Sequence, residues 1–267
     1  MSVDYVALDG ASGEAWAGLR ELCGYDEAAV ADTGTHTALQ LLDRLLVEAP
    51  HTHVGPGDAA ALTASDRDRL LAAVYRRAYG DHITGTVHCI HCGDPFDLHF
   101  SLPALLDSLR QEAASADVQR TPDGAFALPD GRRFRLPTGQ DEMAVAHLPA
   151  AEAEHTLLAR CLLEGDATKT PEAVQQAMEQ VGPVLHLDLK GKCAACGEYQ
   201  PIRFEMQSYL LRAIASERRR LAGEIHLVAS TYGWALQDIL GLPRSQRQMF
   251  AALIEAERDG ARKRWYA

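Results

Sequence analysis

Two Cys-x-x-Cys-Gly motifs constrain the fold of this chain more than any other feature of its sequence. The first spans residues 89–93, and the second spans residues 193–197. A turn of this kind directs two sulfur atoms toward one point, and the glycine lets the backbone curl so that its amides face them. Two such turns complete the tetrahedral thiolate shell that zinc prefers, which leaves no open position for catalysis. The sequence therefore predicts one structural zinc ion, held by Cys89, Cys92, Cys193 and Cys196.

Two other interpretations of the cysteine pairs stay open at this point. A thioredoxin-like redox pair would begin a helix within a βαβ unit, whereas a strand is expected after each pair here. Two pairs of free thiols without a metal are the second alternative. His88 and His91 flank the first motif and offer further ligands. With four sulfurs available, we expect both histidines at the surface or beside the ligands.

Each cysteine pair lies inside a repeated pattern of strand, turn, strand and helix. The first unit is expected to have strands over residues 83–88 and 95–100 and a helix over 102–112. The second begins with an alternation of leucine and polar residues that is typical of a half-buried strand. It is expected to have strands over residues 184–190 and 200–204 and a helix over 208–221. The repeat of this pattern indicates two equivalent hairpins that bring the motifs together.

The rest of the chain is mostly helical in pattern. Leucines at helical spacing predict a helix over residues 37–48, and a loop rich in proline and glycine follows over 50–58. Ser65 is expected to cap a second helix, which ends near Gly80. Between the two cysteine units we expect a hairpin over 126–134 that turns at Asp130-Gly131, a helix over 150–164, and another that opens with Thr170 as cap and Pro171 at its first position. Residues 1–34 show only weak periodicity, and no helix or strand is predicted there.

These elements predict an α+β fold, mainly α, in which a zinc-ribbon-like β unit staples helical lobes. We expect an N-terminal helical lobe over residues 1–80 and a zinc-knuckle unit over residues 81–205. The knuckle unit carries an insert of a hairpin and helices over about residues 113–182. A C-terminal helical module over residues 206–267 completes the chain.

Charge and cysteine use narrow the function classes. The 267-residue chain has a net charge of −11, whereas a protein that grips a phosphate backbone usually presents a basic face. The N-terminus does not resemble a signal peptide, and no apolar run is long enough to span a membrane. Four of the six cysteines form pairs, which favours a reducing, cytoplasmic setting with a metal over disulfides. Cys23 and Cys161 are expected to be buried thiols.

The C-terminal segment has the pattern of three short helices. A turn at 232–234 and the stop at Pro243 separate them, and the third is expected over about 244–257 with Met249, Phe250, Leu253 and Ile254 facing inward. We interpret this segment as a protein-docking module around a partly exposed tryptophan; a helical subdomain with a core tryptophan is the alternative. The residues expected to contact a partner are Tyr232, Trp234, Ile239 and Leu240.

No catalytic motif appears in the sequence. It has no Gly-x-Ser-x-Gly elbow, phosphate-binding loop or dinucleotide fingerprint, and its histidines form no His-Glu-x-x-His pair. We therefore expect a protein that is not an enzyme and has no catalytic residues.

Several short motifs together carry a resemblance to a known family. The string E-I-x-x-x-A-x-x-Y-G-W-x-x-x-x-I-L-x-L-P, which begins at Glu224, is similar to segments in small proteins of contractile phage tails and extracellular contractile injection systems. With the stretch 62–71, the Tyr79-Gly80-Asp81 triplet, both cysteine motifs and the stretch 134–139, the chain resembles baseplate hub assembly chaperones related to those of T-even phages. The motifs are spread over most of residues 36–255.

The resemblance implies a non-enzymatic protein that helps to build, or sits within, the baseplate of a contractile particle. Its partners would be baseplate hub, spike or tape-measure proteins, with no nucleic acid. It would work in the bacterial cytoplasm, and incorporation into the particle stays open. A zinc-ribbon nucleic-acid-associated factor is the alternative from another class, and an enzyme whose site is not readable is a third.

Overall fold

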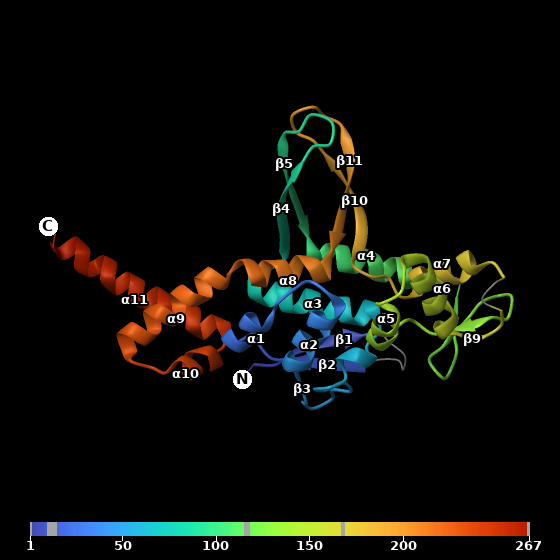
Figure 1. The fold of residues 1–267 in the computed structure, drawn as a ribbon, viewed down its shortest axis with the longest axis horizontal. Helices are drawn as coiled ribbons and strands as arrows, with labels where there is room; N and C mark the ends of the chain where they lie inside the picture. The colour runs from blue at the N-terminus through green and yellow to red at the C-terminus, as the bar shows by residue number, and fades with distance from the viewer. Residues whose placement is uncertain (1, 10–14, 115–117, 167–168, 266–267) are drawn as a thin grey trace.

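The computed structural model describes residues 2–9, 15–114, 118–166 and 169–265. The fold is α+β and mainly helical, as the sequence predicts, with its strands in small antiparallel sheets (Figure 1). The helices are α1 (Gly24–Ala29), α2 (Thr35–Leu45), the short η1 (Ala59–Ala61), α3 (Ala64–Tyr79), α4 (Leu102–Ala114), α5 (Gly139–Val145), α6 (Ala150–Cys161), α7 (Pro171–Val181), α8 (Met206–Ser216), α9 (Arg218–Tyr232), α10 (Leu236–Gly241) and α11 (Arg244–Trp265).

Four small sheets contain the strands. One is formed by β1 (Asp4–Leu8), β2 (Ala15–Leu19) and β3 (Leu46–Val47), in that order. Two are hairpins, β4 (His82–His88) with β5 (Pro95–Ser101), and β10 (His186–Lys192) with β11 (Tyr199–Glu205). The fourth contains β6 (Gln119–Arg120), β7 (Phe126–Ala127), β8 (Arg133–Phe134) and β9 (Leu162–Glu164). The two predicted hairpins around the cysteine pairs are therefore present, with ends shifted by at most two residues.

The main core joins segments that are far apart in the sequence. Leu42 of α2, Leu71 of α3 and Leu211 of α8 are fully buried in it, together with residues at the bases of both hairpins, Ile83 and Leu185. Helix α8, which was expected to open the C-terminal module, thus packs in this core. The predicted helix over residues 208–221 is two helices, because the chain leaves helical geometry at Glu217.

The insert has a small core of its own. Phe134 and Val174 are fully buried there, and every member of this cluster lies between residues 118 and 181. The turn at Asp130-Gly131 is confirmed, and Gly131 has a φ of 88° that favours glycine. The predicted helix over 150–164 ends at Cys161, because residues 162–164 leave it as strand β9 to pair with β8.

Three other expectations differ in detail. The cap of α3 is Thr63 instead of Ser65, because the Thr63 hydroxyl accepts the N–H of Asp66. Thr170 precedes α7 as predicted, but it has a φ of 44° and its side chain makes no capping hydrogen bond. The helix expected over 37–48 ends at Leu45, where the chain enters β3.

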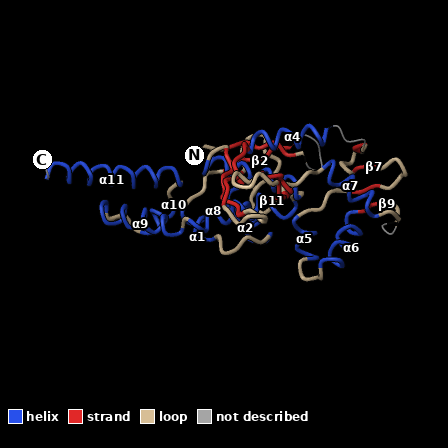
Figure 2. Tube along the Cα trace, turned by 90° about the horizontal axis from the view of Figure 1, so that it is seen from above, coloured by secondary structure: helices blue, strands red, loops and turns tan. Residues whose placement is uncertain are grey.

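The C-terminal helices form one end of an elongated molecule, and the insert forms the other (Figure 1, Figure 2). Val228, Ile239 and Ile254 make a small core between α9, α10 and α11. Buried charges join this module to the body: Glu27 of α1 binds both Arg244 and Arg247 of α11, and Arg247 Nε donates to Glu224 of α9 at 2.7 Å. Among the described helices, none is long and apolar enough to cross a membrane.

Candidate metal centre

The two hairpins stand side by side and project from the helical body in the same direction (Figure 1). Each strand has seven residues, so each hairpin extends about 23 Å at about 3.3 Å per residue. The units are equivalent along their whole length, because matching residues lie at a constant offset in the sequence: Cys89 matches Cys193, and Leu102 at the start of α4 matches Met206 at the start of α8. Even the closing hydrogen bonds at the bases match, from Leu102 N–H to the Asp81 carbonyl and from Met206 N–H to the Leu185 carbonyl.

The turns at the two tips have the same backbone geometry. In the first, the N–H of Gly93 donates to the carbonyl of Cys89, and the N–H of Cys89 donates to the carbonyl of Asp94, both at 2.9 Å. The second turn repeats both bonds between residues 193, 197 and 198. The two glycines have φ values of 81° and 79°, a region that side chains disfavour. This explains why glycine follows each cysteine pair.

The four sulfur atoms meet between the tips, so the predicted cluster is confirmed. The Cys89 and Cys196 sulfurs are 3.6 Å apart, those of Cys92 and Cys193 are 3.7 Å apart, and all four lie within 4.8 Å of one another. A tetrahedral ion with metal–sulfur bonds of about 2.3 Å needs sulfur–sulfur separations of about 3.8 Å. The separations are too long for disulfides, and all six cysteines are free thiols. The donor set therefore fits one metal ion.

The site is half-buried and has an apolar base. Cys89 and Cys193 are buried and pack with Phe96 and Ile202, whereas Cys92 and Cys196 are exposed at the tip. His88 and His91 are exposed on the surface, and the group of four that could hold an ion consists of cysteines alone. Because four sulfurs close a tetrahedron, a metal held here would have no open position for a substrate.

Gln200 joins one hairpin to the other below the sulfurs. Its side chain is 4% exposed and accepts the N–H of Ile90 at 2.8 Å, while its amide donates to the carbonyl of His88 at 3.2 Å. Gly191 of β10 leaves room for side chains of both hairpins, because a Cβ atom there would lie 2.2 Å from Ile202 of its own hairpin and 3.1 Å from Phe96 of the other. Sequence reasoning missed both residues. A glutamine and a glycine close to the second cysteine motif were the only signals in the sequence.

Backbone donors favour the thiolate form of one ligand. The N–H of Cys92 donates to the Cys89 sulfur and, with a smaller contribution from the N–H of His91 at 3.4 Å, lowers the pKa of this thiol to about 6. A thiol that ionises readily is a competent metal ligand, since the thiolate is the form that binds.

The other predicted residues separate into two groups. Tyr232 and Trp234 are exposed by 41% and 39%, as expected for a partly exposed aromatic pair. Ile239 and Leu240 differ from the expectation of partner contacts: Ile239 is fully buried in the module's core, and Leu240 packs against Gly24 of α1. Ile239 packs with residues of α9 and α11, whereas Leu240 faces the body, so each covers a different apolar contact of α10.

The two remaining cysteines also differ from each other. Cys161 is fully buried, as expected, and burial raises the pKa of its thiol to about 11. Cys23 is only half-buried, because it occupies the cap position of α1. Neither belongs to the four-sulfur cluster. No protein-family model, curated protein or solved structure matches this chain.

Proposed function

We propose that the four cysteines hold a structural zinc ion and that the protein is a non-enzymatic adaptor or assembly chaperone. By the resemblance of its motifs, it would serve the baseplate of a contractile, phage-tail-like particle and work in the bacterial cytoplasm. Zinc is the metal that a closed set of four thiolates at these separations favours. Such an ion would fix the two hairpins to each other and leave the binding of partners to other surfaces.

The observation that carries the partner-binding role is an exposed apolar surface on the C-terminal module. We call it the Trp234 patch and define it as Tyr232, Trp234, Phe250, Met249 and Leu253. The Trp234 ring lies 5.2 Å from that of Phe250 and 5.4 Å from that of Tyr232. Met249 and Leu253, one helical turn apart on α11, were expected to face inward, but they are 51% and 50% exposed. Clustered apolar side chains at a surface are typical of protein-binding sites.

The patch is also rigidly supported. Phe250 is half-buried and contacts the core of Val228, Ile239 and Ile254, so the aromatic rings rest on packed helices. An aromatic side chain held in place before binding loses little conformational freedom when a partner covers it. Trp234 is therefore the expected anchor for a baseplate hub, spike or tape-measure protein.

A pair of matched tryptophan substitutions tests this function. Trp234→Ala should weaken co-purification with a co-expressed hub, spike or tape-measure protein by about thirtyfold, since truncation of an aromatic anchor costs about 2 kcal/mol. Trp16→Ala is the control, because Trp16 in β2 is 38% exposed and lies outside the module. Circular dichroism of both variants checks that the helices remain folded. A folded Trp234→Ala protein that binds the co-expressed partner as well as the parent protein does would refute docking at this patch.

A further inference from the structure

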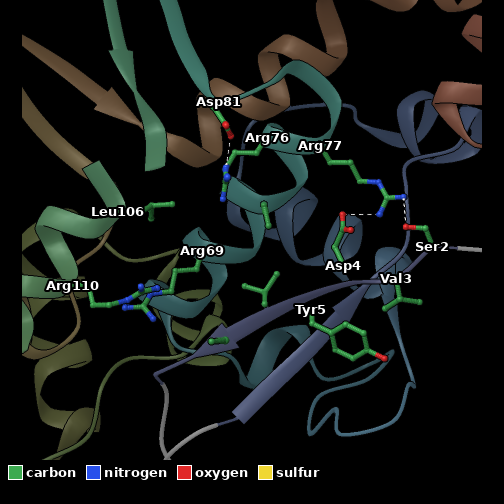
Figure 3. A pocket seen from close by; sticks show the side chains of 13 residues that line it. Ser2, Val3, Asp4, Tyr5, Arg69, Arg76, Arg77, Asp81, Leu106 and Arg110 are labelled. Atoms are coloured by element: carbon green, nitrogen blue, oxygen red, sulfur yellow. Dashed lines mark hydrogen bonds and ion pairs between the residues drawn. The ribbon is translucent and has the colours of Figure 1, made fainter. Parts of the chain in front are cut away.

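A second surface of the molecule, unrelated to the metal centre, combines a free strand edge with a group of arginines. A cavity of about 770 Å³ lies between β1, α3 and α4 (Figure 3). We call it the β1 cleft. It is lined by residues 2–7 and by Arg69, Arg76, Arg77 and Arg110, among others.

The cleft borders the edge of β1 and not one of its faces. Successive side chains of a strand point to opposite faces, yet consecutive residues 4–7 all line the cavity. Strand β1 is the outermost strand of its sheet and pairs with β2 on one side only. Its other edge, which faces the cleft, is therefore available for pairing.

The register shows which backbone groups this edge presents. Ala7 lies opposite Trp16 of β2, and Trp16 directs both its N–H and its carbonyl away from β1, to His53. In an antiparallel pair, Ala7 must then direct its own two groups away from β2, and so must Tyr5 two residues earlier. Within the described part of the chain, no hydrogen bond occupies these groups of Tyr5 and Ala7.

Positive charges outnumber negative ones among the residues that line the cleft, and each lining arginine also contacts a carboxylate. Four arginines and two aspartates line the cleft, although the whole chain has a net charge of −11. Asp4 and Asp81 each bind one arginine, Arg77 at 2.7 Å and Arg76 at 2.6 Å. Arg69 contacts Asp9, but its Nη1 atom is buried and has no hydrogen-bond partner.

Arg69 and Arg110 are the pair best placed to receive an anion. Figure 3 shows their side chains directed toward each other from α3 and α4. Arg110 is only loosely paired, since its contact with Asp107 is 3.8 Å long and exposed. Two guanidinium groups that face each other repel, and a carboxylate between them would relieve the repulsion through paired hydrogen bonds.

We propose that the β1 cleft binds an extended, acidic segment of a partner protein. The segment adds to β1 as a further strand, through the N–H and carbonyl groups of Tyr5 and Ala7, and its carboxylates bind Arg69 and Arg110. Strand addition supplies affinity through the backbone, while side-chain contacts beside the edge supply specificity. A nucleic-acid strand would use the arginines but lacks the alternating donors and acceptors that match a strand edge. The inference rests on the cleft alone and does not depend on a role in a baseplate.

The test uses the full-length protein and a fluorescein-labelled peptide of sequence Val-Glu-Val-Glu-Val-Glu, with binding measured by fluorescence anisotropy. We expect saturable binding that weakens with added salt. The same peptide with lysine in place of glutamate should not bind. A labelled six-residue oligothymidylate is the nucleic-acid comparison.

Two variants separate the backbone contribution from the charge contribution. Ala7→Pro removes an N–H that points into the cleft and leaves the hydrogen bonds to β2 intact. An edge strand tolerates proline at such a position. Arg110→Gln removes one exposed guanidinium. Each should weaken peptide binding about tenfold, whereas Arg212→Gln, at an exposed position on α8, should not. The proposal is overturned if the acidic peptide does not bind, if either cleft variant binds it like the parent protein, or if the oligothymidylate binds as tightly and is insensitive to Ala7→Pro.

Discussion

The sulfur atom of Cys89 lies 3.6 Å from that of Cys196, a cysteine of the other hairpin that is 107 positions away in the sequence. The second short sulfur contact, between Cys92 and Cys193, also crosses from one hairpin to the other. Each hairpin thus supplies two corners of the tetrahedron. A metal bound here would link the hairpin of β4 and β5, which leads into α4, to the hairpin of β10 and β11, which leads into α8.

We predict one zinc ion per chain and its loss in Cys193→Ser. Three sulfurs cannot close the shell, so elemental analysis of the purified variant should return little zinc. The unfolding free energy should fall by about 2–5 kcal/mol, the range seen when a native disulfide that joins distant segments is removed. Cys23→Ser is the control, since serine keeps the capping geometry of α1 and this thiol lies outside the cluster. An unchanged melting curve for Cys193→Ser would show that the metal does not support the fold.

Close packing of the hairpins depends on Gly191. In Gly191→Ala the added Cβ would meet Ile202 and Phe96, so these side chains must shift, and we expect a loss of about 1–3 kcal/mol of stability. Gly85→Ala, in the matching hairpin, is the control because a Cβ atom there meets nothing within 4 Å. Chemical denaturation of both variants measures the difference. Equal stability of the two would contradict tight packing of Ile202 and Phe96 around Gly191.

The buried carboxylate of Glu27 should hold the C-terminal module on the body. Glu27→Gln leaves Arg244 and Arg247 without their shared negative charge, and both arginines are almost fully buried. We expect a loss of about 3–5 kcal/mol, with faster amide hydrogen exchange in α9 and α10 than in α3. The matched control is Asp188→Asn, which removes an exposed ion pair with Arg203 and should change stability by less than about 1 kcal/mol. Similar exchange in the variant and the parent protein would argue against this attachment.

Asp68 should make stability depend on pH in an unusual direction. Burial raises the pKa of this carboxyl from 3.8 to about 6, and Arg67 offsets the effect only in part. Because the folded pKa lies above the unfolded one, ionised Asp68 lowers stability above about pH 6, and the penalty disappears as the pH falls toward about 4. A shift of this size corresponds to about 3 kcal/mol.

The variant Asp68→Asn isolates this contribution. Asparagine keeps an acceptor for the N–H of Leu185, which Asp68 binds at 2.8 Å. Its stability gain over the parent protein should be largest near pH 7.5 and shrink by about 3 kcal/mol near pH 4. Acid release of a metal affects both proteins equally, so it cancels when the unfolding free energy of the parent protein is subtracted from that of the variant. A gain that stays constant over this range would contradict a raised pKa.

Local signals predicted the four-cysteine cluster well, because the cysteine spacing, the following glycine and the flanking strands all lie within a few residues of each other. Non-local features were missed. Strands β1 and β2 lie in a segment with weak periodicity, and packing of β1 against α3 stabilises them. Charged residues are usually exposed. The burial of Glu27, Arg244 and Arg247 in one network therefore could not be predicted before the fold was known. The β1 cleft likewise forms only where β1, α3 and α4 meet, so it could not be predicted from the sequence.

The long stretch of chain between the two halves of the cluster has a consequence for biosynthesis. The last cysteine of the first pair precedes the first cysteine of the second by 101 positions. At about 5–20 residues per second, a ribosome needs about 5–20 s to cover that distance. During this interval the nascent chain holds a two-sulfur half-site that cannot retain a metal in a closed shell. A metal held at this site would therefore be loaded late in synthesis. If it is zinc, as proposed, the supply of zinc to the cell would decide how many newly made copies have their two hairpins linked.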